Sequence, residues 1–273
     1  MHRPVVFCLL LAGTSFTAAA QDTLPPVDRF YSGAGRYWAD HDLDTRWDAS
    51  DGSMGTHVNV QRDLGFADRQ DALVWNVGGS LGEERRHKFD AFGYDYDDDT
   101  TRLLDRTLQI GNNAYPVDAD LDGRLALKIT GVSYTWFFHH DGQRAFGVGL
   151  GAMRYDVDVD LEATATVAGS PVAYANTLSE DEWAPMLRVE YVHALPAHWR
   201  WGASLAYTRK TGGNVTGDAR DVQVELEYFP WQHVGFSLRY NYNDVDLDFE
   251  RTRFDGNLNL NNRGPQLLAL LRF

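Results

Sequence analysis

The stretch Val222-Gln223-Val224-Glu225-Leu226-Glu227-Tyr228 alternates apolar residues with Gln or Glu along its whole length. Side chains of a β-strand point alternately to its two faces, so this strand would carry its apolar residues on one face and its acids on the other. In a water-soluble sandwich the acids would face solvent, whereas in a membrane barrel they would face the lumen. The pattern predicts a strand, and the neighbouring segments decide between the two environments.

Segments on both sides of this stretch show the same division. They span residues 187–191, 199–208 and 234–243. Trp199, Trp201 and Trp231 lie beside the short turns around Pro196 and Pro230. Aromatic residues at strand ends are typical of the girdles that mark the two edges of a membrane. The sequence therefore favours an all-β fold, a single antiparallel transmembrane β-barrel.

Turn lengths predict the orientation, because bacterial barrels have short periplasmic turns and long outer loops. The short links lie at 82–87, 139–144, 196–198 and 230–233, and the outer ones at 97–122, 161–182, 211–219 and 249–263. Counting back from Phe273 gives about ten strands, which is an even number and puts both ends on the periplasmic side. They are expected at 29–40, 72–81, 87–97, 123–138, 144–160, 183–195, 199–210, 219–229, 234–248 and 264–273.

The segment 41–71 leaves the number of strands open. Thr56 to Arg62 reads as another strand, which could pair with the first one outside the membrane across the Asp51-Gly52 turn. If it crosses the bilayer instead, a further crossing must lie nearby. Eight or twelve strands therefore stay possible.

The first residues predict export. His2 and Arg3, an apolar run from Val5 to Ala12 and small residues ending at Ala20 fit a signal peptide over 1–20. No linker divides residues 21–273, so we expect one barrel domain there. The only cysteine lies in the signal peptide, which excludes disulfides and thiolate catalysis after cleavage. The 39 acids outnumber the 25 Lys and Arg residues, and this excess argues against nucleic acid as a partner.

Several short motifs, taken together, resemble a family of proteobacterial outer-membrane β-barrel proteins. They are Gly55-Thr56 with 62–66, 104–107 with Gly111 and Tyr115-Pro116, and the ending 264–273. The resemblance covers nearly the whole mature chain and implies a single barrel in the bacterial outer membrane, with no reaction and no ligand. In the ending, one face carries Leu267, Ala269, Leu271 and Phe273, which resembles the signal read by the outer-membrane assembly machinery.

Acidic runs at the predicted outer rim suggest a weak divalent-cation site. The two that we single out are Asp156, Asp158 and Asp160, and Asp244, Asp246 and Asp248. Alternation puts the acids of each run on one face, and oxygen-rich clusters suit Ca²⁺ or Mg²⁺, which could bridge to lipopolysaccharide phosphates. A solvated rim explains the same runs more simply.

In both acidic runs the apolar residues change from even to odd positions. The change follows Ala152 in one segment and Tyr242 in the other, with Met153 and Val245 as the first odd apolar residues. A β-bulge would produce such a change, and bulges concentrate at barrel rims. We expect the strands to continue beyond the membrane as a projecting sheet.

The side chains expected inside the barrel have mixed charge. They are Arg36, Asn76, Asp95, Arg154, Arg188, Glu190, Ser204, Thr208, Glu225, Glu227, Arg239 and Asn241. A barrel of ten strands is narrow, and buried charges must be paired to be tolerated. We therefore expect a salt-bridged plug and no open pore.

Catalysis would need histidines near acids on the outer side. Only His41 and His57 are expected there, and His41 has Asp40, Asp42, Asp44 and Asp48 nearby in the sequence. Outer-membrane proteases also have ten strands and use outer-rim Asp and His, but no serine-hydrolase, zinc or phosphate-loop motif is present. We expect a non-enzymatic barrel without cofactors, whose acidic outer loops contact lipopolysaccharide, cations or an external partner. The alternatives are a narrow small-solute channel and, third, a hydrolase.

Overall fold

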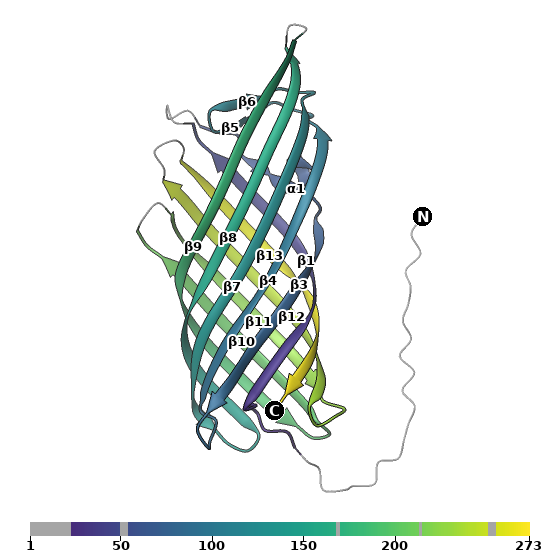
Figure 1. Ribbon diagram of the computed structural model, residues 1–273. Coiled ribbons are helices and arrows are strands. Elements are labelled where there is room, and N and C mark those ends of the chain that lie inside the picture. The colour runs from purple at the N-terminus through teal and green to yellow at the C-terminus, as the bar shows by residue number, and fades with distance from the viewer. Residues whose placement is uncertain (1–22, 50–53, 168–169, 213–214, 251–254) are drawn as a thin grey trace.

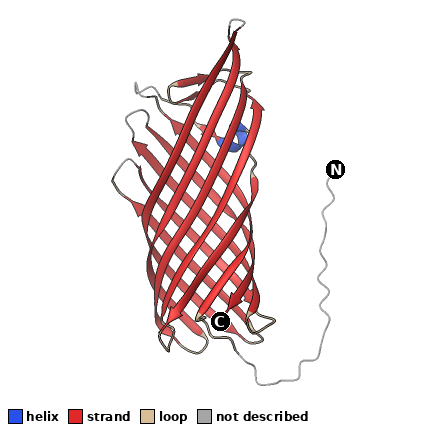
Figure 2. Cartoon of the chain, in the orientation of Figure 1, coloured by secondary structure: helices blue, strands red, loops and turns tan. Residues whose placement is uncertain are grey.

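The computed structural model describes residues 23–49, 54–167, 170–212, 215–250 and 255–273, so the expected signal peptide lies outside the described residues. They form one closed antiparallel barrel of ten tilted strands (Figures 1 and 2). The barrel strands are β1 (Phe30–Trp47), β3 (Arg69–Leu81), β4 (His87–Leu103), β7 (Asp120–His140), β8 (Arg144–Val167), β9 (Ser170–Leu195), β10 (Trp199–Lys210), β11 (Val215–Tyr228), β12 (Val234–Glu250) and β13 (Asp255–Arg272).

Pairing between the first and last strands closes the barrel, from Tyr31 opposite Arg272 to Trp47 opposite Gly256. All ten expected strands are present, and the structure excludes eight or twelve. Most of them extend further outward than the sequence indicates. The hairpin of β8 and β9 is paired up to Val167 opposite Ser170 and projects beyond the other strands (Figure 1). The long outer loops are therefore mostly paired strand.

The segment 56–62 is a strand for only two residues. β2 (Val58–Asn59) pairs with β1 as expected, but the helix α1 (Val60–Leu64) begins directly after it. The Asn59 side chain accepts a hydrogen bond from the Arg62 backbone amide, and Gly65 ends the helix with a left-handed φ of 85°. This N-cap and C-cap glycine favour a helical turn where alternation alone predicted a strand.

A second short element joins α1 at the mouth of the barrel. The hairpin of β5 (Leu108–Ile110) and β6 (Asn113–Tyr115) lies across the top (Figure 1). We refer to residues 55–66 and 104–119 together as the cap. Among the described residues α1 is the one helix, and none has the length and apolar character of a membrane span.

The barrel has two zones in which the chemistry of its faces is reversed. In the membrane zone, nearer the termini, apolar residues such as Leu150 point outward and the lumen is polar. In the outer zone, beyond it, residues such as Met153 and Val157 point inward and are buried, while Asp158 points outward. The lumen of the outer zone is therefore packed like the core of a soluble protein.

No β-bulge accompanies this reversal, so the bulge prediction is wrong. The register of β8 with β9 is continuous from Arg144 to Val167, and that of β12 with β13 is continuous from Val234 to Glu250. The backbone alternation never changes; the surroundings of its two faces do. The barrel wall is surrounded by lipid in the membrane zone and by water in the outer zone. The apolar residues therefore point outward in the first zone and inward in the second.

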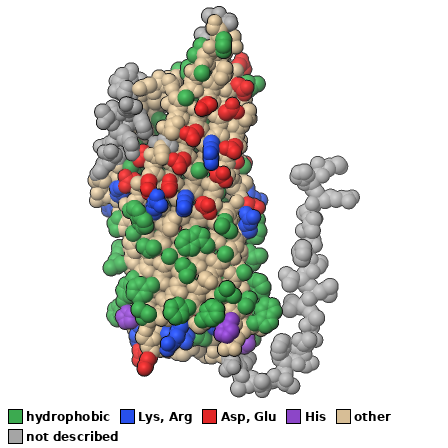
Figure 3. All heavy atoms as spheres, viewed as in Figure 1, with side chains coloured by type: hydrophobic (Ala, Val, Ile, Leu, Met, Phe, Trp, Pro, Cys, Tyr) green, Lys and Arg blue, Asp and Glu red, His purple; other side chains and the backbone are tan. Residues whose placement is uncertain are grey.

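The outer surface shows these zones as bands (Figure 3). Hydrophobic side chains cover the lower part of the face drawn, Lys and Arg side chains gather at its upper edge, and acids dominate above them. Rings at the end that carries the termini include Trp199 stacked on Tyr228, with centroids 4.6 Å apart, and His233 stacked on Phe273 at 5.4 Å. This arrangement fits a membrane-spanning band with an aromatic lower edge.

Candidate functional site: the closed lumen and the capped outer zone

Ion pairs fill the lumen of the membrane zone. The Nζ atom of Lys88 donates to Oε1 of Glu190 at 2.5 Å, and Arg188 Nε lies 3.4 Å from the other Glu190 oxygen. Nearby, Nε of Arg239 donates to Glu225 at 2.9 Å. Paired in this way, the charges can stay inside a narrow barrel.

The predicted lumen set is right for nine of its twelve residues: Asn76, Arg188, Glu190, Ser204, Thr208, Glu225, Glu227, Arg239 and Asn241. Arg36, Asp95 and Arg154 were wrongly placed inside, because each lies on the outward face. Asp95 and Arg154 lie at the water-facing end of the lipid-facing band, where an outward charge costs little. Sequence reasoning did not single out Lys88, Asp90, Arg200 and Asp221, which line the cavity described below.

The segment before β1 closes the periplasmic end. The Asp28 carboxylate is buried and lies 2.7 Å from Arg200 Nη2 and 3.3 Å from Arg272 Nη1. Arg200 also pairs with Glu227 and donates to the Pro25 carbonyl at 3.2 Å. Residues 24–28 are thereby held across the mouth of the barrel.

A second layer closes the lumen where the two zones meet. Tyr37, which is fully buried, donates from its hydroxyl to the Asn262 side chain at 3.0 Å, and Asn262 donates to the Tyr94 hydroxyl at 2.9 Å. Between this layer and residues 24–28 lies a cavity of about 110 Å³, lined by charged groups such as Asp90 and Asp221. It has room for several water molecules.

Above that layer the barrel is filled with apolar side chains. Leu125, Leu127, Val159, Leu161 and Leu260 are all buried. A cavity of only about 20 Å³ remains beneath the cap. Little more than one water molecule fits in such a space, so this cavity has no room for a continuous aqueous path between the described residues that line it.

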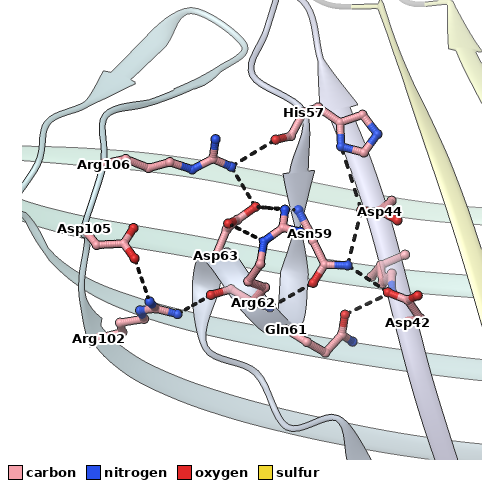
Figure 4. Close-up of polar contacts among 11 residues, drawn as sticks. Asp42, Asp44, His57, Asn59, Gln61, Arg62, Asp63, Arg102, Asp105 and Arg106 are labelled. Carbon is pink, nitrogen blue, oxygen red and sulfur yellow. Dashed lines mark hydrogen bonds and ion pairs between the residues drawn. The ribbon is translucent and has the colours of Figure 1, made fainter.

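Polar contacts hold the cap in place (Figure 4). Asp63, on α1, is buried and receives Nη2 of Arg106 at 2.7 Å, Nη2 of Arg62 at 3.0 Å and the backbone amide of Asn59 at 2.8 Å. Arg106 also donates to the His57 carbonyl at 3.2 Å. The motifs around Arg62 and Arg106, which carry the family resemblance, therefore meet as a structural brace.

The environment of Asp63 favours its ionised form. Burial by itself raises the pKa of this carboxyl, but hydrogen bonds from Arg62 and the Asn59 amide, together with the charge of Arg106, hold the pKa below its usual value. Asn59 extends the brace to β1, because its side-chain amide donates to Asp42 at 2.7 Å and to Asp44 at 3.2 Å. The cap is therefore tied to the barrel wall through charged groups.

The structure does not gather the six predicted metal ligands. Asp156, Asp158 and Asp160 lie on β8, and Asp244, Asp246 and Asp248 lie on β12, with three strands, β9 to β11, between them. No group of three or more acids, histidines or cysteines placed to hold a metal occurs among the described residues. The strands expected at 183–195, 199–210 and 219–229 already separate the two runs, and the structure keeps that order, so their carboxylates do not meet. Cation binding by either run alone stays a prediction.

Cations line the boundary between the apolar band and the acids, pointing outward. They are Arg36, Arg69, Lys128, Arg154, Arg209, Arg220 and Arg263. Some are paired: Arg154 makes two 2.6 Å contacts to Asp181, and Arg69 Nε lies 2.6 Å from Asp40. Sequence reasoning missed this set because its members are scattered along the chain and meet only when the barrel closes.

The two outer histidines are placed differently from each other. His41 points into the barrel and stacks on Tyr96 at 4.2 Å, whereas Asp40 and Asp42 point outward. Adjacent strand positions face opposite sides, so the expected grouping of His41 with these acids does not form. His57 is exposed, with Nδ1 3.8 Å from Asp44.

A solved structure of an outer-membrane protease has a similar fold, and two further solved structures align with lower scores. The outer membrane protease OmpT from Escherichia coli aligns with a TM-score of 0.54 and 8% identity, over 96% of this chain and 100% of its own. The toluene transporter TodX from Pseudomonas putida (8% identity, 90% of each chain) and a Pseudomonas aeruginosa FadL homologue (10% identity, 90% and 91%) align with TM-scores of 0.34 and 0.36.

No family model matches the chain, and no curated protein matches it in sequence. At such low identity the alignment with OmpT shows the fold alone. The closed barrel and its outward apolar band agree with that fold. The chain is a ten-stranded transmembrane β-barrel of the bacterial outer membrane.

Proposed function

We propose that this protein is a non-conducting, non-enzymatic outer-membrane barrel that uses its capped outer zone as a binding surface. One observation carries the proposal: the lumen is closed at three successive levels. Asp28 and its arginines close the periplasmic end, Tyr37 and Asn262 close the middle, and buried leucines fill the outer zone. A narrow channel for small solutes would need a continuous polar path, and these layers interrupt it.

The form of the outer zone supports binding. Its strands extend well beyond the apolar band, its interior is packed, and the cap is braced by Asp63 and Arg106. Such a rigid structure is more than a membrane anchor requires. Preorganised surfaces bind with less loss of conformational freedom, which favours a role in recognition.

Flux measurements test this proposal. Liposomes that contain the refolded full chain should swell in small sugars and amino acids no faster than empty liposomes. Swelling at a rate that depends on solute size would instead support the channel. A refolded outer-membrane porin serves as the positive control for insertion and solute exchange.

A hydrolase is the second alternative, and the contact between His57 and Asp44 is the observation that favours it. His57 is exposed and Asp44 is half-buried on the outer side, and the shared fold with a protease adds no argument about activity. The full chain should leave a mixed peptide library uncut. Cleavage that disappears in Asp44→Asn would overturn the non-enzymatic part of the proposal.

A further inference from the structure

One cation lies within the lipid-facing surface itself. Arg36 on β1 points outward, and its cross-strand neighbours are Leu267 on β13 and Leu73 on β3. These leucines are 48% and 52% exposed, as lipid-facing residues are. Trp38, the next outward residue on β1, is also exposed and lies nearer the outer zone. Arg36 therefore lies at the upper edge of the apolar band, below a tryptophan.

Among the described residues, Arg36 has no counterion. Within the part of the chain that the structure describes, its guanidinium has no hydrogen bond or ion pair. Asp71, the outward acid next along β3, is opposite Trp38 and not opposite Arg36. A charge facing lipid is costly unless it reaches a polar partner at the interface. The missing partner must come from the membrane.

Arg263, on the neighbouring strand β13, is in a similar position. It is exposed and opposite Asp40, but Asp40 is already bound by Arg69 at 2.6 Å. Arg36 is opposite Leu267, which lies four residues from Arg263, or roughly 13 Å along the strand. Among the described residues, Arg69 therefore holds Asp40, whereas neither Arg36 nor Arg263 forms an ion pair of its own.

Above Arg263, the next three outward residues of β13 are amides: Asn261, Asn259 and Asn257. Opposite Asn261 and Asn259, both neighbouring strands carry aspartates, whereas Asn257 has Asp248 on β12 and Arg46 on β1. Asn261 donates to the Tyr242 hydroxyl at 2.9 Å, and Asn259 donates to Asp246. An anionic headgroup with attached sugars would contact amides along β13. On the strands to either side it would contact carboxylates.

The other outward cations are more fully balanced. Lys128 is opposite Asp95 on one side and Asp156 on the other, and Arg209 is opposite Asp218. Arg154 is held by Asp181. Arg36, by contrast, has no acid opposite it on either neighbouring strand.

We propose that Arg36 and Arg263 bind the phosphates of one lipopolysaccharide molecule at the seam between β1 and β13. This binding proposal rests on the proposed function only in that the outer zone faces the cell exterior, because lipopolysaccharide forms the outer leaflet of the outer membrane. Its lipid anchor carries phosphates at both ends of a disaccharide, and two separated arginines fit two phosphates. Guanidinium groups bind phosphate through paired, charge-assisted hydrogen bonds, and the apolar band below accepts the acyl chains.

Native mass spectrometry of the full chain, refolded in neutral detergent and titrated with diphosphoryl lipid A, tests the proposal. The double variant with Arg36→Gln and Arg263→Gln should bind lipid A about tenfold more weakly or worse, because charge-assisted hydrogen bonds are lost. Arg29→Gln removes an exposed arginine before β1, at the periplasmic end, and should bind as the wild type does. Arg36→Lys should retain part of the affinity, since it keeps the charge but loses the paired geometry.

Competing ligands identify the source of the phosphate. Dephosphorylated lipid A, phosphatidylglycerol and inorganic phosphate should each compete poorly at equal concentration. Equal binding of phosphatidylglycerol or phosphate, or unchanged lipid A affinity in a double variant that keeps heat-modifiable gel mobility, would overturn the proposal. Neither result would alter solute flux, so failure of this site and failure of the closed-barrel function can be told apart.

Discussion

Nη2 of Arg106 lies 2.7 Å from Oδ2 of Asp63, and this contact joins the two segments of the cap. Asp63 is buried and also forms an ion pair with Arg62, so its replacement by Asn would leave two arginines without their counterion. We expect Asp63→Asn to lower the stability of the cap by about 1 to 3 kcal/mol. Hydrogen exchange of residues 55–66 measures this, and Asp105→Asn, which removes an exposed partner of Arg102, is the control.

If Asp63→Asn increased hydrogen exchange in residues 55–66 no more than Asp105→Asn does, the result would contradict the bracing role of Asp63. A double-mutant cycle with Arg106→Gln separates this contact from the others. The two single changes should not be additive, since each removes the same interaction.

The same carboxylate predicts a dependence on pH. The folded-state pKa of Asp63 is lowered, so its contribution is complete above the unfolded value of about 3.9 and is lost as the pH falls through the lower folded value. The cap should therefore become sensitive to an acid-active protease only at strongly acidic pH. The ratio of cleavage rates in wild type and Asp63→Asn cancels the protease's own pH dependence. A ratio that stays constant across this range would contradict the prediction.

The two faces of β9 and β10 in the membrane zone should respond differently to substitution. Val189 is 40% exposed on the lipid-facing side, and Val189→Arg should cost about 2 to 4 kcal/mol if it lies near the bilayer centre. Ser204 faces the lumen and accepts from Arg188 at 3.2 Å, so Ser204→Thr keeps the hydroxyl and should change stability little. Urea unfolding in lipid vesicles compares them, and equal losses would show that the faces are assigned wrongly.

Assembly should depend on the last residue. Phe273 is 69% exposed beside the apolar face of β13, and its backbone exchanges hydrogen bonds with Phe30. Phe273→Asp would put a charge at the end of that face and remove the expected signal for the assembly machinery. Cell fractionation should show much less Phe273→Asp protein than wild-type protein in the outer membrane. Arg272→Gln keeps the terminal aromatic residue and should insert better than Phe273→Asp. Normal accumulation of Phe273→Asp would contradict this role.

The ten membrane strands were predictable because lipid imposes a strict alternation, which residues 222–228 and their neighbours carry plainly. The outer zone was harder to predict from the sequence. There the apolar face turns inward, and the reversal after Ala152 resembles a bulge when only the sequence is read. Arg36 was assigned to the lumen because a lipid-facing charge is unusual, and the arginine seam forms only when β13 pairs with β1. The cap depends on Asp63 meeting Arg106 from a distant segment, which alternation cannot show.

Electrical recording tests the closed lumen most directly. The full chain, refolded and inserted into a planar bilayer, should show no steady unitary currents in concentrated potassium chloride, because Asp28, Tyr37 and the buried leucines of the outer zone interrupt the path. Insertion is verified on the same preparation by heat-modifiable mobility. Steady unitary currents of constant amplitude, present in the wild type at low voltage, would contradict the account.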